Sequence, residues 1–389
     1  MDINKLYEEH KKEIYDIDKI IEKEGVSLFG AGQYGEFVSE YLIKNGYKIN
    51  CFIDNNPNKH GTKINNIEIV SKDSDPSKNS KAVLITAHHS IDEIIEENKH
   101  LYKHIMSFEK YLAIKRFYDF LNTRNMMDDN NSKKILDTLV YAKITGCESL
   151  CQNIYSDNQY FDIPKFKFGS INEIFFNVGA YTGDTVERII YSRLGGFKHI
   201  YAFEPGKKQF EAMNIRIERL KKEWAINDNK ISLVNLGVSD KNETLEFNDN
   251  SDLLCNRVSN IKENTIKIQT CSVDNFLNGK EINFLISDIE GYEINMLKGA
   301  INTIKNYKPK MAISVYHKPD DLLTIPEFIK NLVPEYKFAL RHHNITFDDT
   351  VLYCWIENTR RDETRRDDSL CFALVRVEPW RVGKAMRRI

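Results

Sequence analysis

Short apolar segments alternate with amphipathic helical stretches from residue 25 onward, and this alternation constrains the fold more than any other feature. Residues 26–29, 49–54 and 82–86 are predicted strands, and a helix is expected between the first two, ending near Ile43. Strands separated by helices are typical of βαβ units with a parallel sheet. Residues 1–24 place isoleucines near helical spacing and predict an amphipathic N-terminal helix.

A second alternating block begins near residue 171. Its predicted strands are 174–178, 199–203, 231–235, 284–287, 311–315, 337–341 and 350–355, and its main helices are 184–191, 207–222 and 292–306. Seven strands, the last two without a strong helix between them, predict a doubly wound α/β sheet with an antiparallel strand at one side. Residues 91–150 are mostly helical in pattern. We therefore expect a small α/β domain at 25–110, a helical connector at 111–170 and a larger α/β domain at 171–358.

Charge excludes one class of function. The 55 Lys and Arg nearly balance the 57 Asp and Glu, and this near-neutral net charge of −2 argues against a nucleic-acid binder. The final stretch, 359–389, carries nine basic and five acidic side chains, and all but one of its basic residues are Arg. We interpret it as an Arg-rich tail of different origin. No signal peptide or apolar run of membrane-spanning length is evident, so we expect a cytoplasmic protein without a transmembrane segment.

The first glycine turn has the pattern G-x-G-x-x-G, formed by Gly30, Gly32 and Gly35 between a strand and a helix. Such a turn lets a helix N-terminus face a phosphate group. Asp54 ends the next strand, where a carboxylate could bond ribose hydroxyls. The unit is short for a six-strand dinucleotide domain, so it could hold one nucleotide half or no ligand.

The second glycine turn, 177–184, also follows a strand and opens a helix, and three further segments end at the same rim. They are Glu204-Pro205 after the next strand, 236–240 after the third, and 288–291 after the fourth. Ligands of open α/β sheets bind outside the carboxyl ends of the strands, so these four segments should converge on one site.

Residues 171–356 resemble FkbM-type methyltransferases, which are S-adenosylmethionine-dependent O-methyltransferases with the class I seven-stranded fold. The matching segments are F-N-V-G-A-Y-T-G-D-T at 176–185, A-F-E-P at 202–205, D-I-E-G-Y-E at 288–293 and M-L-K-G-A at 296–300. The resemblance implies that the loop at Gly179 approaches the methionine part of the cofactor, that Glu204 holds the ribose and that Asp240 lies near the adenine. The cofactor-binding residues it implies are Asn177, Gly179, Ala180, Tyr181, Gly183, Asp184, Glu204, Pro205, Asp240 and Asp288.

Two positions depart from the family pattern. Asn177 stands where the family often has Asp, and Ile286 stands where a Lys commonly precedes the D-x-E-G segment. The amide of Asn177 can still accept a hydrogen bond. The missing Lys puts the charge balance near Asp288, and with it activity, in doubt.

The N-terminal unit resembles the small Rossmann-like domain of bacterial sugar-modifying enzymes. The resemblance rests on the turn at 30–35, on F-I-D-N-N at 52–56, on Gly61 and on I-E-I-V at 67–70. It implies a sugar nucleotide, or NAD, as a ligand near Gly30, Gly32, Gly35 and Asp54.

Methyl transfer to an alcohol needs an aligned acceptor and a group that removes its proton. Three side chains at the expected rim qualify as catalytic candidates: His317, Asp288 and Glu290. His317 is the most natural base by its intrinsic pKa, because imidazole titrates close to neutral pH. The same three residues make a conceivable metal set, but residues from only two strands are insufficient, so no metal is assigned. His342 and His343 could line the acceptor pocket or be exposed loop residues.

The sequence therefore predicts a methyltransferase that uses S-adenosylmethionine to modify a hydroxyl of a sugar, glycan or related small molecule. We expect a small-molecule or glycan substrate, no nucleic-acid partner and a possible homodimer. Two alternatives stay open. In one, the N-terminal domain is the catalytic unit of an NAD- or sugar-nucleotide-dependent enzyme. In the other, the chain is an inactive binding protein that keeps the methyltransferase fold, which Asn177 and Ile286 would permit.

Overall fold

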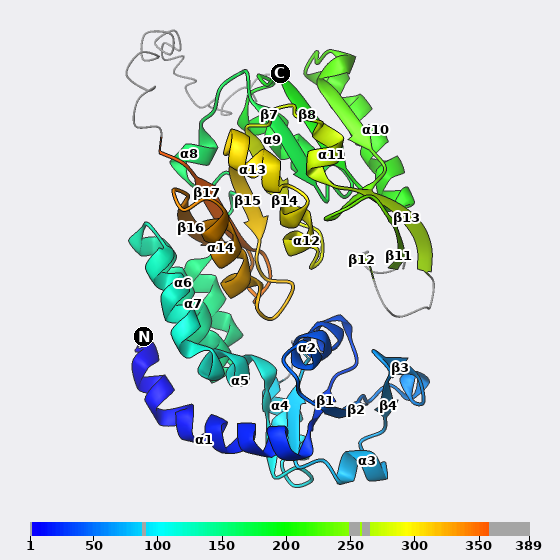
Figure 1. Cartoon of the computed structure of the whole chain (residues 1–389), viewed down its shortest axis with the longest axis vertical. Coiled ribbons are helices and arrows are strands. Elements are labelled where there is room, and N and C mark those ends of the chain that lie inside the picture. The colour runs from blue at the N-terminus through cyan, green and yellow to red at the C-terminus, as the bar shows by residue number, and fades with distance from the viewer. Residues whose placement is uncertain (1, 88–90, 249–256, 259–264, 358–389) are drawn as a thin grey trace, which may run out of the picture.

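The described part of the chain contains two α/β units, each built around a main sheet, and a group of helices connects them (Figure 1). The computed structural model describes residues 2–87, 91–248, 257–258 and 265–357, and the Arg-rich tail at 359–389 lies outside them. Within the described residues, no helix is both long enough and apolar enough to cross a bilayer.

The N-terminal sheet has the strand order β3-β4-β2-β1-β5-β6. Its strands are β1 (Val26–Phe29), β2 (Ile49–Ile53), β3 (Lys63–Ile64), β4 (Ile67–Val70), β5 (Ala82–Ile85) and β6 (His104–Ser107). The three expected strands are present and parallel. Three further strands complete the sheet: the two-residue β3 pairs antiparallel with β4 at one edge, and β6 extends the other edge. β6 also interrupts the stretch 91–150, which was expected to be helical.

Four helices accompany this sheet: α1 (Ile3–Glu24), α2 (Gln33–Lys44), α3 (Asp75–Lys78) and α4 (Ile91–Asn98). The expected N-terminal helix is confirmed. Asp2 caps α1 by accepting a hydrogen bond from the Lys5 amide (3.0 Å), and the helix buries Ile14, Ile17 and Ile21 at helical spacing.

The connecting region consists of α5 (Phe108–Lys115), α6 (Phe117–Met126), α7 (Asn130–Thr145), a 3₁₀ segment at Glu148–Ile154 and α8 (Pro164–Lys167). Asp129 caps the start of α7, and Gly146 ends it in the left-handed conformation. The Ser132 hydroxyl of α7 accepts a hydrogen bond from the Leu340 amide (2.8 Å), so this helix is fastened to the larger sheet.

The larger sheet has the order β16-β17-β15-β14-β7-β8-β9, which confirms the seven-stranded fold. Its strands are β7 (Ile174–Val178), β8 (His199–Phe203), β9 (Ile231–Val234), β14 (Phe284–Ser287), β15 (Lys310–Ser314), β16 (Lys337–His342) and β17 (Thr350–Trp355). The expected antiparallel strand is β17, which runs opposite to both of its neighbours. A smaller sheet joins β10 (Gly237–Val238), β11 (Thr244–Asn248), β12 (Arg257–Val258) and β13 (Thr265–Cys271).

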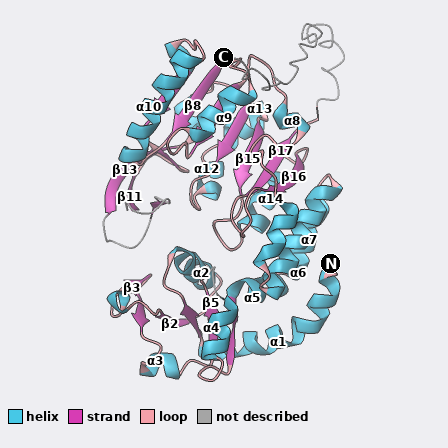
Figure 2. Cartoon of the chain, turned by 180° about the vertical axis from the view of Figure 1, so that it is seen from behind, coloured by secondary structure: helices cyan, strands magenta, loops and turns pink. Residues whose placement is uncertain are grey.

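Helices cover both faces of the seven-stranded sheet (Figures 1 and 2). One face packs against α8, α9 (Asp184–Ser192) and α10 (Lys207–Glu223). The opposite face packs against α11 (Val273–Leu277), α12 (Glu293–Lys298), α13 (Ile301–Tyr307) and α14 (Asp321–Leu332). This doubly wound arrangement explains why the central strands read as continuous apolar runs.

The helix expected over 292–306 is two helices, α12 and α13. A side chain of another element causes the break, because the Asp274 carboxylate of α11 accepts hydrogen bonds from the Asn302 and Thr303 amides and so starts a new helix there. At Gly299 the backbone passes so close to Ser239 that a Cβ would lie 2.2 Å from the Ser239 carbonyl oxygen.

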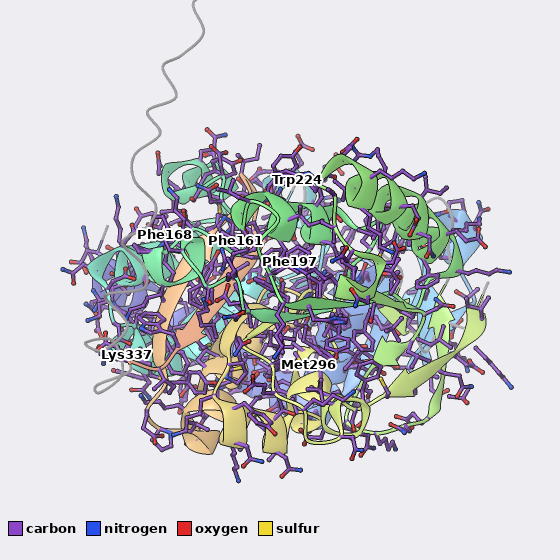
Figure 3. All side chains as sticks on the ribbon, turned by 90° about the horizontal axis from the view of Figure 1, so that it is seen from above. Phe161, Phe168, Phe197, Trp224, Met296 and Lys337 are labelled. Atoms are coloured by element: carbon purple, nitrogen blue, oxygen red, sulfur yellow. The ribbon has the colours of Figure 1, made fainter. Side chains whose placement is uncertain are left out.

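Phe166 of α8 packs the connector against strands β14 and β17 of the larger sheet. Its buried ring meets the edges or faces of Phe284 (5.1 Å), Tyr353 (5.0 Å) and Trp355 (6.5 Å between centroids). Phe168 lies two residues further and is 70% exposed, near Phe161 in the view of Figure 3.

Phe166→Ala should lower the free energy of unfolding by about 3–5 kcal/mol, because it opens a cavity within this aromatic cluster. Phe168→Ala removes the same ring from an exposed position and should change it by no more than about 0.5 kcal/mol. Chemical denaturation of both variants measures the difference. Equal midpoints for the two would contradict the packing described here.

Candidate functional site

A cavity of about 290 Å³ lies at the carboxyl ends of β7, β8 and β14. Seven of the residues expected to bind the cofactor or the acceptor line it: Gly179, Tyr181, Asp184, Glu204, Pro205, Asp288 and Glu290. In-register parallel pairing brings these segments together, because Val178 pairs with Phe203 on one side and with Ser287 on the other. The convergence expected for these strand ends is therefore present.

The turn after β7 needs glycine at position 179. Its φ angle is +78°, and a Cβ there would lie 1.9 Å from the Asp288 carbonyl oxygen. The following backbone is held by Glu204, whose carboxylate accepts hydrogen bonds from the amides of Tyr181 (3.0 Å) and Gly206 (2.7 Å). Glu204 thus shapes the turn as well as lining the cavity.

Four of the expected cofactor residues do not line the cavity. Asn177 and Ala180 are buried next to the turn, and Gly183 precedes the first residue of α9. Asp240 is exposed, and its carboxylate accepts a hydrogen bond from the neighbouring Ser239 hydroxyl (3.1 Å). The role near an adenine that the resemblance implied for Asp240 stays a prediction.

The Asp288 carboxylate is the centre of a hydrogen-bond cluster on the cavity wall. Tyr160 donates to Oδ2 (2.9 Å), Tyr316 donates to Oδ1 (3.3 Å), and His317 Nε2 lies 3.3 Å from Oδ1. Burial alone would raise the pKa of Asp288, but His317 and Tyr160 stabilise the ionised form and lower it. Asp288 is therefore a carboxylate at neutral pH.

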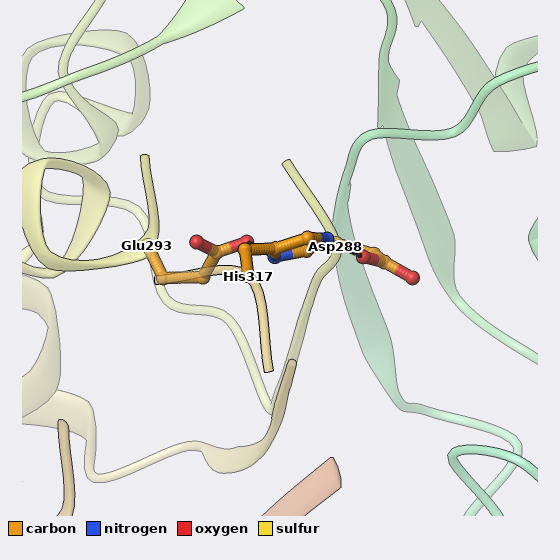
Figure 4. Close-up of side chains that lie close together, drawn as sticks. All are labelled: Asp288, Glu293 and His317. Atoms are coloured by element: carbon orange, nitrogen blue, oxygen red, sulfur yellow. Dashed lines mark ion pairs between the residues drawn. The ribbon is translucent and has the colours of Figure 1, made fainter. Parts of the chain in front are cut away.

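His317 lies behind this wall, between two carboxylates (Figure 4). Its Nδ1 atom is 3.1 Å from Glu293 Oε1, and its Nε2 atom is 3.7 Å from Glu290 Oε2. Burial would lower the pKa of His317, but Glu293, Asp288 and Glu290 outweigh it and raise that pKa well above its usual value. An imidazole that already holds its proton cannot take one from an acceptor, so the geometry does not favour His317 as the general base.

Sequence reasoning missed four residues of this site. Tyr160 comes from the connector, whose helical pattern gave no sign of it, and Tyr316 directly precedes His317 in the sequence. Glu293 is fully buried and is the last residue of the D-I-E-G-Y-E segment. Its place in that motif, five residues after Asp288, was the signal that could have identified it. Asp321, at the start of α14, is also buried, and burial together with the charge of Glu293 raises its pKa to about 8.

Residues of the N-terminal unit itself occupy the hydrogen-bonding groups of Asp54 next to the glycine turn. The Asp54 carboxylate accepts hydrogen bonds from the amides of Ala31 (2.9 Å) and Asn56 (2.8 Å) and forms an ion pair with Lys59 (3.0 Å). At Gly35, a Cβ would lie 2.2 Å from the Gly30 carbonyl oxygen, so helix and strand pack too closely for any other residue. A Cβ at Gly32 would meet nothing within 4 Å.

This turn faces the larger domain. The side chain of Gln33, the first residue of α2, donates a hydrogen bond to Glu290 Oε2 (3.2 Å). Lys318 places its ammonium group 3.8 Å from Glu40 of α2 and 5.4 Å from the centre of the Phe37 ring. Glu290 is therefore held by both α/β units.

His342 and His343 do not line the cavity. His342 is fully buried at the end of β16, between the Thr350 hydroxyl (2.8 Å) and the Thr346 carbonyl oxygen (2.7 Å). His343 lies between the Ser156 carbonyl oxygen (2.7 Å) and the Tyr353 hydroxyl (3.0 Å). Their interpretation as exposed loop residues was wrong, because both imidazoles serve the packing of β16, β17 and the connector.

Comparison with known proteins assigns a family model to the domain that holds the cavity. Residues 177–340 match the family model described as the methyltransferase FkbM domain, so the resemblance inferred from the motifs is confirmed for this segment. Residues 22–106 match a second family model, described as C2185-like, N-terminal. None of the curated proteins is similar enough to this chain to count as a relative.

Among solved structures, methyltransferase FkbM from Methylobacillus flagellatus KT has a TM-score of 0.56 and 18% sequence identity, covering 91% of this chain and 99% of that one. This likeness shows a shared fold over most of the chain. An rRNA methylase from Streptococcus thermophilus has a TM-score of 0.32 and 13% identity over 48% of this chain and 89% of its own. A Streptococcus mutans protein in complex with SAH has a TM-score of 0.31 and 13% identity over 48% and 90%, respectively.

The imidazole of His342 should stay neutral until the pH falls to about 4, because burial lowers its pKa to that value. The unfolded chain takes up this proton near pH 6.5. The contribution to stability is therefore present above pH 6.5 and is lost as the pH falls towards 4, by about 3 kcal/mol in total. Imidazole NMR shifts report the protonation state directly.

The pH dependence of unfolding tests the same statement. His342→Gln should flatten the loss of unfolding free energy between pH 6.5 and 4, whereas His100→Gln, which removes an exposed histidine, serves as the control. A His342 resonance that titrates near pH 6.5 in the folded protein would contradict the assignment.

Proposed function

We propose that the chain is an S-adenosylmethionine-dependent O-methyltransferase that acts on a hydroxyl of a sugar, glycan or related small molecule. The observation that carries this proposal is the cavity lined by Gly179, Glu204 and Asp288, within a segment that matches the methyltransferase FkbM domain. Ligands of open α/β folds bind at this edge of the sheet.

The residues around the cavity fit the cofactor. Both polar atoms of the Asn177 amide are buried next to the turn and have no hydrogen-bond partner among the described residues. Glu204 already accepts two backbone hydrogen bonds, but a carboxylate offers about four acceptor positions and can also receive ribose hydroxyls. We assign Glu204 to the ribose and the turn at Gly179 to the amino-acid end. Asn177 lies buried next to that turn and does not line the cavity.

When bound, S-adenosylmethionine would supply a methyl group on a positively charged sulfur. The acceptor oxygen would bond the methyl carbon, and the neutral thioether would leave. The chain must then orient the acceptor and accept its proton. Asp288, fixed by two tyrosines, is suited to orient the hydroxyl by accepting its hydrogen bond. Glu290, also on the wall, is our candidate for the proton acceptor, and the nearby His317 favours the ionised form of Asp288.

The choice of a sugar acceptor rests on the N-terminal unit. Its glycine turn reaches Glu290 through Gln33, so the two units contribute to one region. Gly32 leaves open space where a side chain would fit, which is compatible with a phosphate group approaching the backbone. We therefore keep a sugar nucleotide as the proposed ligand of this turn, with NAD as the alternative. A homodimer and a cytoplasmic location remain predictions.

Glu204→Gln and Glu204→Ala should each weaken S-adenosylmethionine binding by at least tenfold, because they remove the charged acceptor for the ribose hydroxyls. Isothermal titration calorimetry of the full chain measures the affinity. Glu211→Gln, an isosteric change at an exposed position of α10, should bind like the wild type. Unchanged affinity in both Glu204 variants would remove the assignment of this cavity to the cofactor.

A further inference from the structure

We propose that Asp288, Glu293 and His317 bind a divalent transition-metal ion behind the cavity wall. Each of the three side chains offers one ligand atom, and these atoms all lie within 4.8 Å of one another. They come from three separate places in the chain: the end of β14, the first residue of α12 and the loop after β15. The site is inferred from geometry and does not rest on methyl transfer or on the cofactor assignment, although Asp288 belongs to both sites. A bound metal ion would replace the proton on the ligating nitrogen of His317.

The contacts among these groups have the spacing of ligands but lack the geometry of hydrogen bonds. Carboxylate oxygens lie 3.1 to 3.7 Å from the two nitrogens of His317, yet neither nitrogen forms a hydrogen bond with the described residues. The imidazole side chain is only 4% exposed, and water is therefore largely excluded as a partner. Glu293 Oε2 is likewise buried without a hydrogen-bond partner. Native proteins rarely leave such groups unsatisfied.

The charge of the surrounding side chains favours a cation that carries more than one positive charge. Within the described part of the chain, the ion pairs of Asp288 and Glu293 are formed with His317 alone, and Glu290 approaches the same imidazole. Among the described residues, Asp288 and Glu293 thus share the single positive charge that His317 can carry. Buried carboxylates are retained when they are paired or coordinate a metal, and a divalent ion would neutralise most of this excess.

The donor set selects among metals. Two carboxylates and one imidazole suit Mn²⁺, Co²⁺ or Zn²⁺ better than Ca²⁺, which prefers six to eight oxygen ligands. Three protein ligands also leave coordination positions open, as in metal sites that exchange a small ligand. Asp288 belongs both to this set and to the cavity wall, so an open position would lie close to the cavity.

Metal titration of the full-length chain, after removal of bound metal with a chelator, tests the site. We expect one Mn²⁺ per chain, detected by the loss of the free-ion electron paramagnetic resonance signal, and an absorption band from bound Co²⁺. Ca²⁺ should not compete at equal concentration. Glu293→Gln, which is isosteric, and His317→Gln should each weaken Mn²⁺ binding by at least tenfold.

Two controls make the result specific. Asp184→Asn removes a different carboxylate from the same cavity and should bind Mn²⁺ like the wild type. Glu204→Ala should also keep the metal, so a failure of the cofactor assignment and a failure of the metal site can be told apart. Thermal unfolding confirms that each variant is folded, and a His317→Gln chain that does not fold leaves Glu293→Gln as the deciding variant.

The proposal is overturned if the wild type binds Mn²⁺ and Co²⁺ no more tightly than Ca²⁺, or if Glu293→Gln binds Mn²⁺ as the wild type does. Either result would mean that the three side chains form a metal-free relay, with a doubly protonated imidazole between two carboxylates.

Discussion

The site depends on the Asp288 carboxylate, which stands at the end of the central strand β14. This strand pairs with β7 on one side and β15 on the other, so any group that holds Asp288 is tied to the middle of the sheet. Tyr160 reaches it from the connector, and Tyr316 and His317 reach it from the loop after β15. A carboxylate this enclosed is stable only with such partners. The position of the cavity wall therefore follows from two tyrosine hydrogen bonds and one ion pair that converge on one side chain.

The N-terminal unit takes part in the same region of the molecule. Gln33 bonds Glu290, and the Phe37 ring packs so closely on Gly291 that a Cβ there would lie 2.9 Å from the ring. Glu290 and Gly291 both have positive φ angles, and Glu290 is a residue type for which this conformation is unfavourable. Contacts from two units thus hold one strained segment. This arrangement suggests a physical reason why the two α/β units occur together in one chain, because the smaller unit helps to shape the wall of the larger one.

Much of the fold could be predicted from local pattern, and much less of the site. Apolar runs and glycine turns located all seven strands of the larger sheet to within about one residue, because a buried parallel strand must be continuously apolar. The motif residues Gly179, Glu204 and Asp288 could be predicted as one site because they follow strands that end at the same edge of the sheet. Tyr160, by contrast, comes from 128 residues away in the chain. The break between α12 and α13 is set by Asp274 of another helix, and the state of His317 is set by carboxylates whose proximity no local pattern reveals.

The two departures from the family pattern turn out to be neighbours. Ile286 of β14 and Asn177 of β7 are register partners in the parallel sheet, and both are buried. Where the family commonly has Asp and Lys at these positions, the two opposite charges would therefore be adjacent in the interior. Replacing both with neutral residues removes an ion pair and leaves the local net charge unchanged, which is often tolerated, whereas the loss of one partner alone is strongly destabilising. The cation next to Asp288 is instead His317, which comes from the loop after the neighbouring strand β15. The two departures are thus one paired change in the interior of the sheet, and the activity of the chain stays a prediction.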